Sequence, residues 1–171
     1  ASVTYHGNYL ASTTAYTDTT DIKTLTHYFG YKGEELAGFS QTFIKDQAGT
    51  NGIVRDTSIY AYQADVLDTV TMYKGGTARS NSVASLALKS LTKYAGTIRG
   101  QEQADYAYSY GGANSREYTA STSVYFYGAS RGRASAGVTG STAMTTLYTY
   151  KGEVDYAQVQ ASDAPIEALK T

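Results

Sequence analysis

Tyrosines separated by a single residue recur along this chain, and they constrain its fold more than any other feature. The chain has 18 tyrosines among 171 residues, with no tryptophan and only 4 phenylalanines. Successive side chains of a β-strand point to opposite faces, so each Tyr-x-Tyr group predicts a stripe of rings on one face of a strand. These groups are Tyr60 and Tyr62; Tyr106, Tyr108 and Tyr110; Tyr125 and Tyr127; and Tyr148 and Tyr150.

The alternation of β-branched, aromatic and polar residues predicts an all-β protein. We expect antiparallel sheets arranged as a meander, a sandwich-like fold or a β-arcade. The clearest strands are expected at residues 57–66, 104–110, 122–128 and 144–158. Glycines recur between these segments, and Asn51 with Gly52 is the best tight-turn pair. The length fits a single β-rich domain over residues 1–171.

Two segments carry helical signals. Residues 81–94 place apolar side chains at helical spacing, but they also alternate from Leu86 onward, and we favour a strand there because the surrounding sequence is β-like. Residues 162–170 contain the only proline, Pro165, near their start. Proline is favoured in the first turn of a helix, so a short C-terminal helix is expected.

The tripeptide Tyr-Lys-Gly occurs three times, at residues 31–33, 73–75 and 150–152. The spacings are unequal, so they do not define a solenoid period. We interpret the tripeptide as part of a reused strand–bulge–strand unit.

The composition predicts a small aliphatic core. Hydrophobic residues make up 42% of the chain, but many of them are alanine and tyrosine. There is no cysteine, which excludes disulfides, thiolate nucleophiles and cysteine-based metal sites. Stability is expected to come from strand hydrogen bonds and aromatic packing, or from neighbouring copies of the chain.

The sequence offers few candidates for catalysis or for nucleic-acid binding. The formal net charge is −1, whereas nucleic-acid binders usually carry a basic surplus. We interpret the only local basic cluster, Arg131 and Arg133 with Arg116 upstream, as solvated loop charge. His6 and His27 stand beside tyrosines in strand-like surroundings, and no Gly-x-Ser-x-Gly motif accompanies them. We therefore expect a protein that is not an enzyme and has no nucleic-acid partner.

No cofactor is expected. The local acidic pairs match no EF-hand loop, and we interpret them as solvated charge. A calcium ion that stabilises an assembly is the alternative, without a motif to support it. The pairs are Asp18 with Asp21, Asp65 with Asp68, and Glu34 with Glu35.

We expect an extracellular or cell-surface protein. No stretch approaches the ~18 apolar residues of a membrane-spanning helix, so no membrane span is expected. The start of the chain, Ala1-Ser2-Val3, suits a mature N-terminus after removal of a signal peptide.

These features together predict self-assembly into a homopolymer. Long strands with almost no proline and near-zero net charge leave sheet edges open to pairing with further copies. Tyrosine supplies a large flat contact area for packing one sheet face on another. The residues expected to make these contacts are Tyr60, Tyr62, Tyr106, Tyr108, Tyr110, Tyr125, Tyr127, Tyr148, Tyr150 and Tyr156.

In its composition and in its repeated Tyr-Lys-Gly and Tyr-x-Tyr segments, the chain resembles the major sheath proteins of filamentous methanogenic archaea. The resemblance implies a secreted, non-enzymatic wall component whose β-sheets assemble into a sheath, tube or filament. Two alternatives stay open. A small outer-membrane β-barrel would use the tyrosines as interfacial girdles. A secreted carbohydrate-binding β-sandwich would use them to contact sugars.

Overall fold

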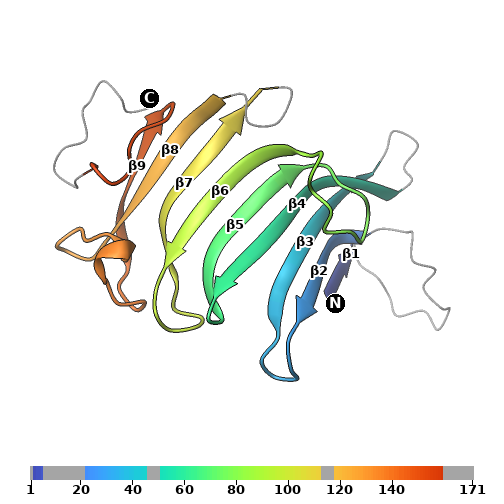
Figure 1. Ribbon diagram of the computed structural model, residues 1–171, viewed down its shortest axis with the longest axis horizontal. Helices are drawn as coiled ribbons and strands as arrows, with labels where there is room; N and C mark the ends of the chain where they lie inside the picture. The colour runs from blue at the N-terminus through green and yellow to red at the C-terminus, as the bar shows by residue number, and fades with distance from the viewer. Residues whose placement is uncertain (1, 6–21, 46–50, 113–117, 160–171) are drawn as a thin grey trace. The chain divides into compact units, whose positions relative to one another are not determined.

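The computed structural model of the chain describes residues 2–5, 22–45, 51–112 and 118–159. Within these residues, nine strands and one short 3₁₀ helix form, and the strands follow one another in a single sheet in chain order (Figure 1). The all-β prediction is confirmed, in the form of a meander. The elements are β1 (Ser2–Tyr5), β2 (Ile22–Phe29), β3 (Leu36–Lys45), β4 (Asn51–Gln63), β5 (Val66–Lys74), β6 (Ala87–Ala95), β7 (Gln103–Gly111), β8 (Tyr118–Tyr127), η1 (Ala134–Ala136) and β9 (Met144–Lys151).

The chain forms two compact units, Ala1–Ile59 with Met72–Leu86 and Tyr60–Thr71 with Ala87–Thr171. The core of the first unit is a small cluster of Ile22, Leu25, Phe43 and Val54. Gln41 is fully buried beside it. Its Nε2 donates to the carbonyl oxygens of residues 77 and 80, both at 3.0 Å, and its Oε1 accepts from the backbone N–H of residue 79 at 2.8 Å. The segment after β5 is therefore fixed over β3 by one buried amide.

The core of the second unit is more aromatic. It consists of Val124, Phe126, Tyr150 and Val159, with further tyrosines packed against it. Both cores are small, as the shortage of large aliphatic residues predicts.

Strands β2 to β5 and strands β6 to β9 are two copies of one four-strand repeat. Residues 22–30 (IKTLTHYFG) correspond to residues 88–96 (LKSLTKYAG), at the start of each copy. Residues 57–62 (TSIYAY) correspond to residues 122–127 (TSVYFY), in the third strand of each copy. Tyr-Lys-Gly at residues 73–75 and 150–152 ends both copies.

The strand register repeats together with the sequence. In the β2–β3 pair the ladder skips Gly38, and in the β6–β7 pair it skips Asp105 at the corresponding position. In the β3–β4 pair it skips Arg55, and in the β7–β8 pair it skips Ala120. A β-bulge leaves one residue unpaired and bends its strand. Two corresponding bulges therefore show that the copies share their backbone geometry as well as a sequence pattern.

A buried threonine closes each copy. The hydroxyl of Thr57 donates to the carbonyl of Gly75 at 2.8 Å, and the hydroxyl of Thr122 donates to the carbonyl of Gly152 at 2.9 Å. Each glycine N–H in turn donates to the carbonyl of the bulge residue two positions before its threonine, at 2.8 and 2.9 Å. The glycines have φ of 76° and 78°. Positive values of this kind favour glycine. We call this arrangement the threonine–glycine clasp.

The predicted reuse of Tyr-Lys-Gly holds for two of its three occurrences. Residues 31–33 lie instead in the turn between β2 and β3, where the N–H of Glu34 donates to the carbonyl of Tyr31 at 2.9 Å. That occurrence has no place in the clasp.

Three local predictions need correction. Asn51 and Gly52 begin β4 rather than forming a turn. The expected strand 57–66 is interrupted at Ala64 and Asp65, which have φ of 47° and 64° and form a two-residue hairpin turn. The expected strand 144–158 ends at residue 151, because Gly152 leaves the extended region. The strand favoured over a helix after Leu86 is confirmed as β6, whereas residues 162–170 lie outside the described residues.

Candidate functional site

One face of the second unit carries a tyrosine stripe on β7 and β9, with Val124 of β8 between the two strands. The register places Tyr106 opposite Val124, and Val124 opposite Tyr148. Neighbouring rings within the strands lie 5.4 Å apart for Tyr106 and Tyr108, and 6.4 Å apart for Tyr148 and Tyr150. The prediction that Tyr-x-Tyr groups share a face is confirmed for these strands. Tyr110 continues the stripe, with its ring 6.3 Å from that of Tyr108.

The chain itself covers part of this stripe. After β9 it turns back, and the ring of Tyr156 stacks on that of Tyr106 with 3.5 Å between centroids and 13° between planes. Tyr150 beneath is 1% exposed. The pKa of Tyr106 is raised, mainly because burial disfavours the charged phenolate and also because the Tyr156 side chain hydrogen-bonds to it. These rings form an aromatic core within one chain.

The opposite face of the same strands carries a second group of tyrosines. Tyr125 and Tyr127 point there from β8, and Tyr94 lies on the same side of β6. Burial raises the pKa of Tyr94, and the nearby phenol groups of Tyr125 and Tyr60 raise it further. Tyr127 is buried, and its hydroxyl donates to the carbonyl of residue 104 at 2.6 Å. Tyr60, Tyr94 and Tyr125 are half-buried, as is Tyr62 at the end of β4.

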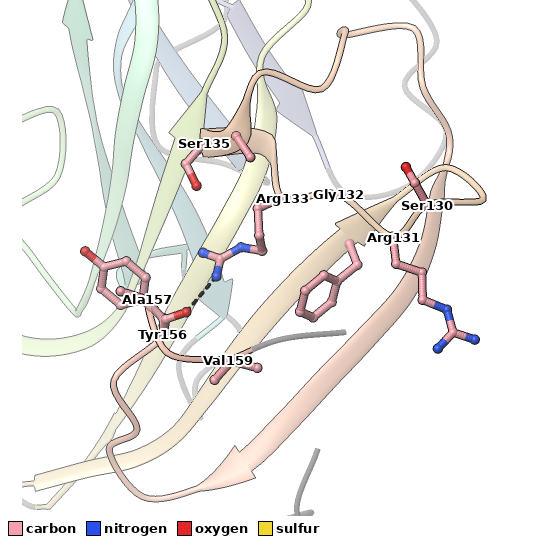
Figure 2. A pocket seen from close by; sticks show the side chains of 10 residues that line it. Ser130, Arg131, Gly132, Arg133, Ser135, Tyr156, Ala157 and Val159 are labelled. Carbon is pink, nitrogen blue, oxygen red and sulfur yellow. Dashed lines mark hydrogen bonds between the residues drawn. The ribbon is translucent and has the colours of Figure 1, made fainter. Parts of the chain in front are cut away.

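The long connection between β8 and β9 builds a buried ion pair. Arg133 donates from Nε to Asp105 Oδ1 at 2.9 Å and from Nη2 to Oδ2 at 2.8 Å. Ser135 donates to the same Oδ1 from its N–H and its hydroxyl, at 3.2 and 3.0 Å. The remaining Nη1 of Arg133 donates to the carbonyl of Tyr156 at 2.6 Å (Figure 2). Asp105 is the bulge residue of β7, so the extra residue in that strand supplies the carboxylate.

An open pocket of about 510 Å³ lies beside this ion pair, lined mainly by Phe126, Arg131, Arg133, Tyr156 and Val159. Figure 2 shows Arg133 directed toward Tyr156, and Arg131 directed away from it. The guanidinium of Arg133 also lies 5.9 Å from the ring centroid of Phe126 and 5.7 Å from that of Tyr156. At such distances a cation is attracted to the face of an aromatic ring. Its charge is therefore matched by Asp105 and the two rings.

This environment corrects the interpretation of Arg133 as solvated loop charge. Arg131 is exposed, as expected, and Arg116 lies outside the described residues.

The ion pair has no local sequence signal, because its partners are 28 residues apart. The one local hint is that Asp105, a carboxylate, directly precedes the tyrosine stripe at Tyr106, which could have suggested a buried partner.

The histidines and acidic side chains of the described residues form no cluster suited to a metal ion. The ring of His27 stacks on that of Phe39 at 5.3 Å, and His6 lies outside the described part of the chain. Within residues 2–5, 22–45, 51–112 and 118–159, no group of three or more histidine, cysteine, aspartate or glutamate side chains is close enough to hold a metal ion. In the same ranges, no helix has the length and apolarity needed to cross a membrane.

The sheet ends in two edge strands, β1 and β9. Among the described residues, β1 pairs only with β2, and β9 pairs only with β8. Strand β9 has 8 residues, no proline and a single charge at its last residue, Lys151. Met144 and Leu147 on this strand are 54% and 46% exposed. Natural edge strands are usually protected by proline, charge or a short length, and β9 has none of these along residues 144–150.

Models of protein families, curated protein sequences and solved structures contain no significant match to this chain.

Proposed function

We propose that this protein is a structural subunit that assembles with copies of itself through the edges of its β-sheet. The observation that carries the proposal is the combination of a repeated strand unit with a terminal strand, β9, that pairs only with β8 among the described residues and has no proline or charge along residues 144–150. Within the chain, the last strand of the first copy, β5, is hydrogen-bonded to the first strand of the second copy, β6. One copy of the repeat can therefore extend a sheet by pairing with the end strand of another. An edge like that of β9 is a template for a further strand.

The charge and composition support the same proposal. A subunit with a net charge of −1 stacks with little electrostatic repulsion. The half-buried tyrosines Tyr60, Tyr94 and Tyr125 offer flat amphipathic area on one face of the second unit, which suits contact with a second sheet. The rings that pack within the chain, Tyr150 and Tyr106 among them, support the fold of the subunit instead.

The proposal places the subunit outside the cell, as part of a sheath, tube or filament. It acts there by forming a continuous hydrogen-bonded sheet, without catalysis and without a cofactor. Its partners are further copies of the same chain.

The direct test is to concentrate the purified protein and follow its size by sedimentation velocity and by negative-stain electron microscopy. We expect concentration-dependent growth into filaments or sheets, with a strand spacing of about 4.7–4.9 Å in fibre diffraction. A protein that stays monomeric over the whole accessible concentration range contradicts the proposal. Leu147→Lys serves as the matched variant, because it places a charge in the middle of the β9 edge and should suppress growth while leaving the circular dichroism spectrum unchanged.

A further inference from the structure

Three strand segments of the chain lead into the same short sequence, a tyrosine followed two residues later by a glycine. Residues 2–7 read SVTYHG, residues 70–75 read VTMYKG, and residues 147–152 read LYTYKG. The second and third segments belong to β5 and β9, the last strands of the two repeats. The first begins in β1, which precedes the first repeat and takes the position next to β2 that β5 takes next to β6.

A strand that leads into Tyr-x-Gly therefore lies next to the first strand of a repeat at two places within the chain. Strand β1 pairs with β2, and β5 neighbours β6. The strands that they meet, residues 22–30 and 88–96, share the sequence pattern described above. Strand β9 is the third strand of this type, and among the described residues no repeat follows it.

We infer that the outer edge of β9 binds the β2 edge of a second copy of this chain, in the position that β1 occupies within its own chain. The inference rests on the proposed function and specifies the strands that meet and their register. Because residues 2–5 correspond to residues 147–150, the β1–β2 register can be transferred directly. Thr4 lies opposite Thr24 and Val3 opposite Leu25, so Thr149 of one copy faces Thr24 of the next, and Tyr148 faces Leu25.

The faces of the two strands agree with this register. Leu25 pairs with Gln41, and Gln41 pairs with Thr57, so the three side chains lie on the same side of the sheet. Tyr148 lies on the same side as Val124 and Tyr106. Thr57 and Thr122 hold the same position in their repeats. A one-residue slip would exchange the two faces, so the faces exclude every register displaced by an odd number of residues. The β1–β2 pairing selects one register among the rest.

The lengths of the strands explain how β9 can replace β1. Strand β1 has 4 residues, whereas β2 and β9 have 8 residues each. A β9 strand from a second copy can therefore extend along all of β2 and form more hydrogen bonds than β1 does. The exchange leaves the register of β2 with β3 unchanged.

Site-specific cross-linking tests the register. The chain has no cysteine, so Thr24→Cys and Thr149→Cys can be introduced into separate full-length chains, mixed and mildly oxidised. Directly opposed residues of antiparallel strands have Cα atoms about 4.5–5.5 Å apart, within the range of a disulfide. We expect a mixed disulfide dimer as the main product. Thr24→Cys mixed with Thr146→Cys is the control, because the second cysteine is displaced along the strand by about 10 Å and its mixed dimer should be lost.

A second variant tests whether β1 is displaced. Val3→Pro with Thr4→Pro removes two neighbouring backbone donors, and one of the two belongs to a hydrogen-bonded pair in any antiparallel register. In the Thr24→Cys background this variant should increase the yield of the mixed dimer. An unchanged or lower yield overturns the replacement of β1. Should Thr24→Cys fail to fold, Thr26→Cys with Leu147→Cys tests the same register.

The outcomes separate this inference from the proposed function. Filaments that form without the Thr24–Thr149 cross-link overturn the inference and leave self-assembly standing. The cross-link without filaments supports the strand pairing but contradicts a polymer. The absence of both overturns both.

Discussion

The threonine–glycine clasp should stabilise the fold through two hydrogen bonds of one hydroxyl. The hydroxyl of Thr122 donates to the carbonyl of Gly152 at 2.9 Å and accepts from the N–H of Val154 at 3.1 Å. Valine has nearly the shape of threonine but cannot form either bond. Thr122→Val therefore leaves one carbonyl and one N–H without this partner. Both backbone groups belong to half-buried residues, so we take about 1 kcal/mol for each, and expect a loss of about 2 kcal/mol in the free energy of unfolding.

The corresponding change in the first repeat should cost less. The hydroxyl of Thr57 donates to the carbonyl of Gly75 and accepts from Nε2 of Gln41 at 3.2 Å. That amide nitrogen keeps two further acceptors after Thr57→Val, so only the glycine carbonyl loses its partner. We expect a loss of about 1 kcal/mol.

Urea denaturation followed by circular dichroism measures these losses, with the two compact units allowed to unfold separately. The control is Thr119→Val on β8, which removes only an exposed hydrogen bond of 3.3 Å to Glu153. A surface change of this kind should alter stability by less than about 0.5 kcal/mol. If the three substitutions cost the same, or if Thr57→Val costs more than Thr122→Val, the reasoning about the clasp is refuted.

Two further predictions concern the second unit. Arg133→Ala leaves the carboxylate of Asp105 buried without its charged partner. The loss should destabilise the unit by about 3–5 kcal/mol. Arg133→Met combined with Asp105→Leu should recover much of that loss in the same urea assay, and a double variant as unstable as the single one argues against the ion pair as the cause. Burial, with the negative charges of nearby groups, raises the pKa of Tyr127 to about 12, so the folded state holds this proton more tightly than the unfolded chain does. The associated stability is present below pH ~10 and is lost as the pH rises toward about 12. Between pH ~7 and alkaline pH, Tyr127→Phe should therefore lose less of its free energy of unfolding than the wild type does. An equal loss in the two proteins contradicts this assignment.

The tyrosine stripes could be predicted from the sequence because alternation within a strand is a local property. Tyr106 and Tyr108 share a face because of their spacing, and no other part of the chain needs to be known. The stacking of Tyr156 on Tyr106 could not be predicted in the same way. It depends on Gly152 ending β9, and Tyr156 has the correct alternation for a longer strand but lies in a turn.

The register and the hairpin turns were harder to predict. The turn at Ala64 and Asp65 lacks the glycine or asparagine that usually marks positive φ. The bulge at Asp105 inserts one residue into an otherwise regular strand, and its meaning depends on Arg133, which lies in a distant loop.

The internal repeat was visible only in part. Tyr-Lys-Gly marked the end of both copies, but the same tripeptide at residues 31–33 lies in an unrelated turn. The copies also differ in length between their third and fourth strands, so no constant period appears in the sequence. The corresponding bulges at Gly38 and Asp105, which only the strand register reveals, establish the relationship.

The difference between the two hairpins has a practical consequence. The first repeat joins its last two strands with Ala64 and Asp65 alone, whereas the second uses residues 128–143 and keeps the same clasp between Thr122 and Gly152. The cost of closing a loop rises only slowly with its length, so a long connection is compatible with this register. The two-residue turn between β4 and β5 is therefore a natural place to graft a foreign peptide, such as an epitope or an enzyme tag, onto every subunit of an assembly.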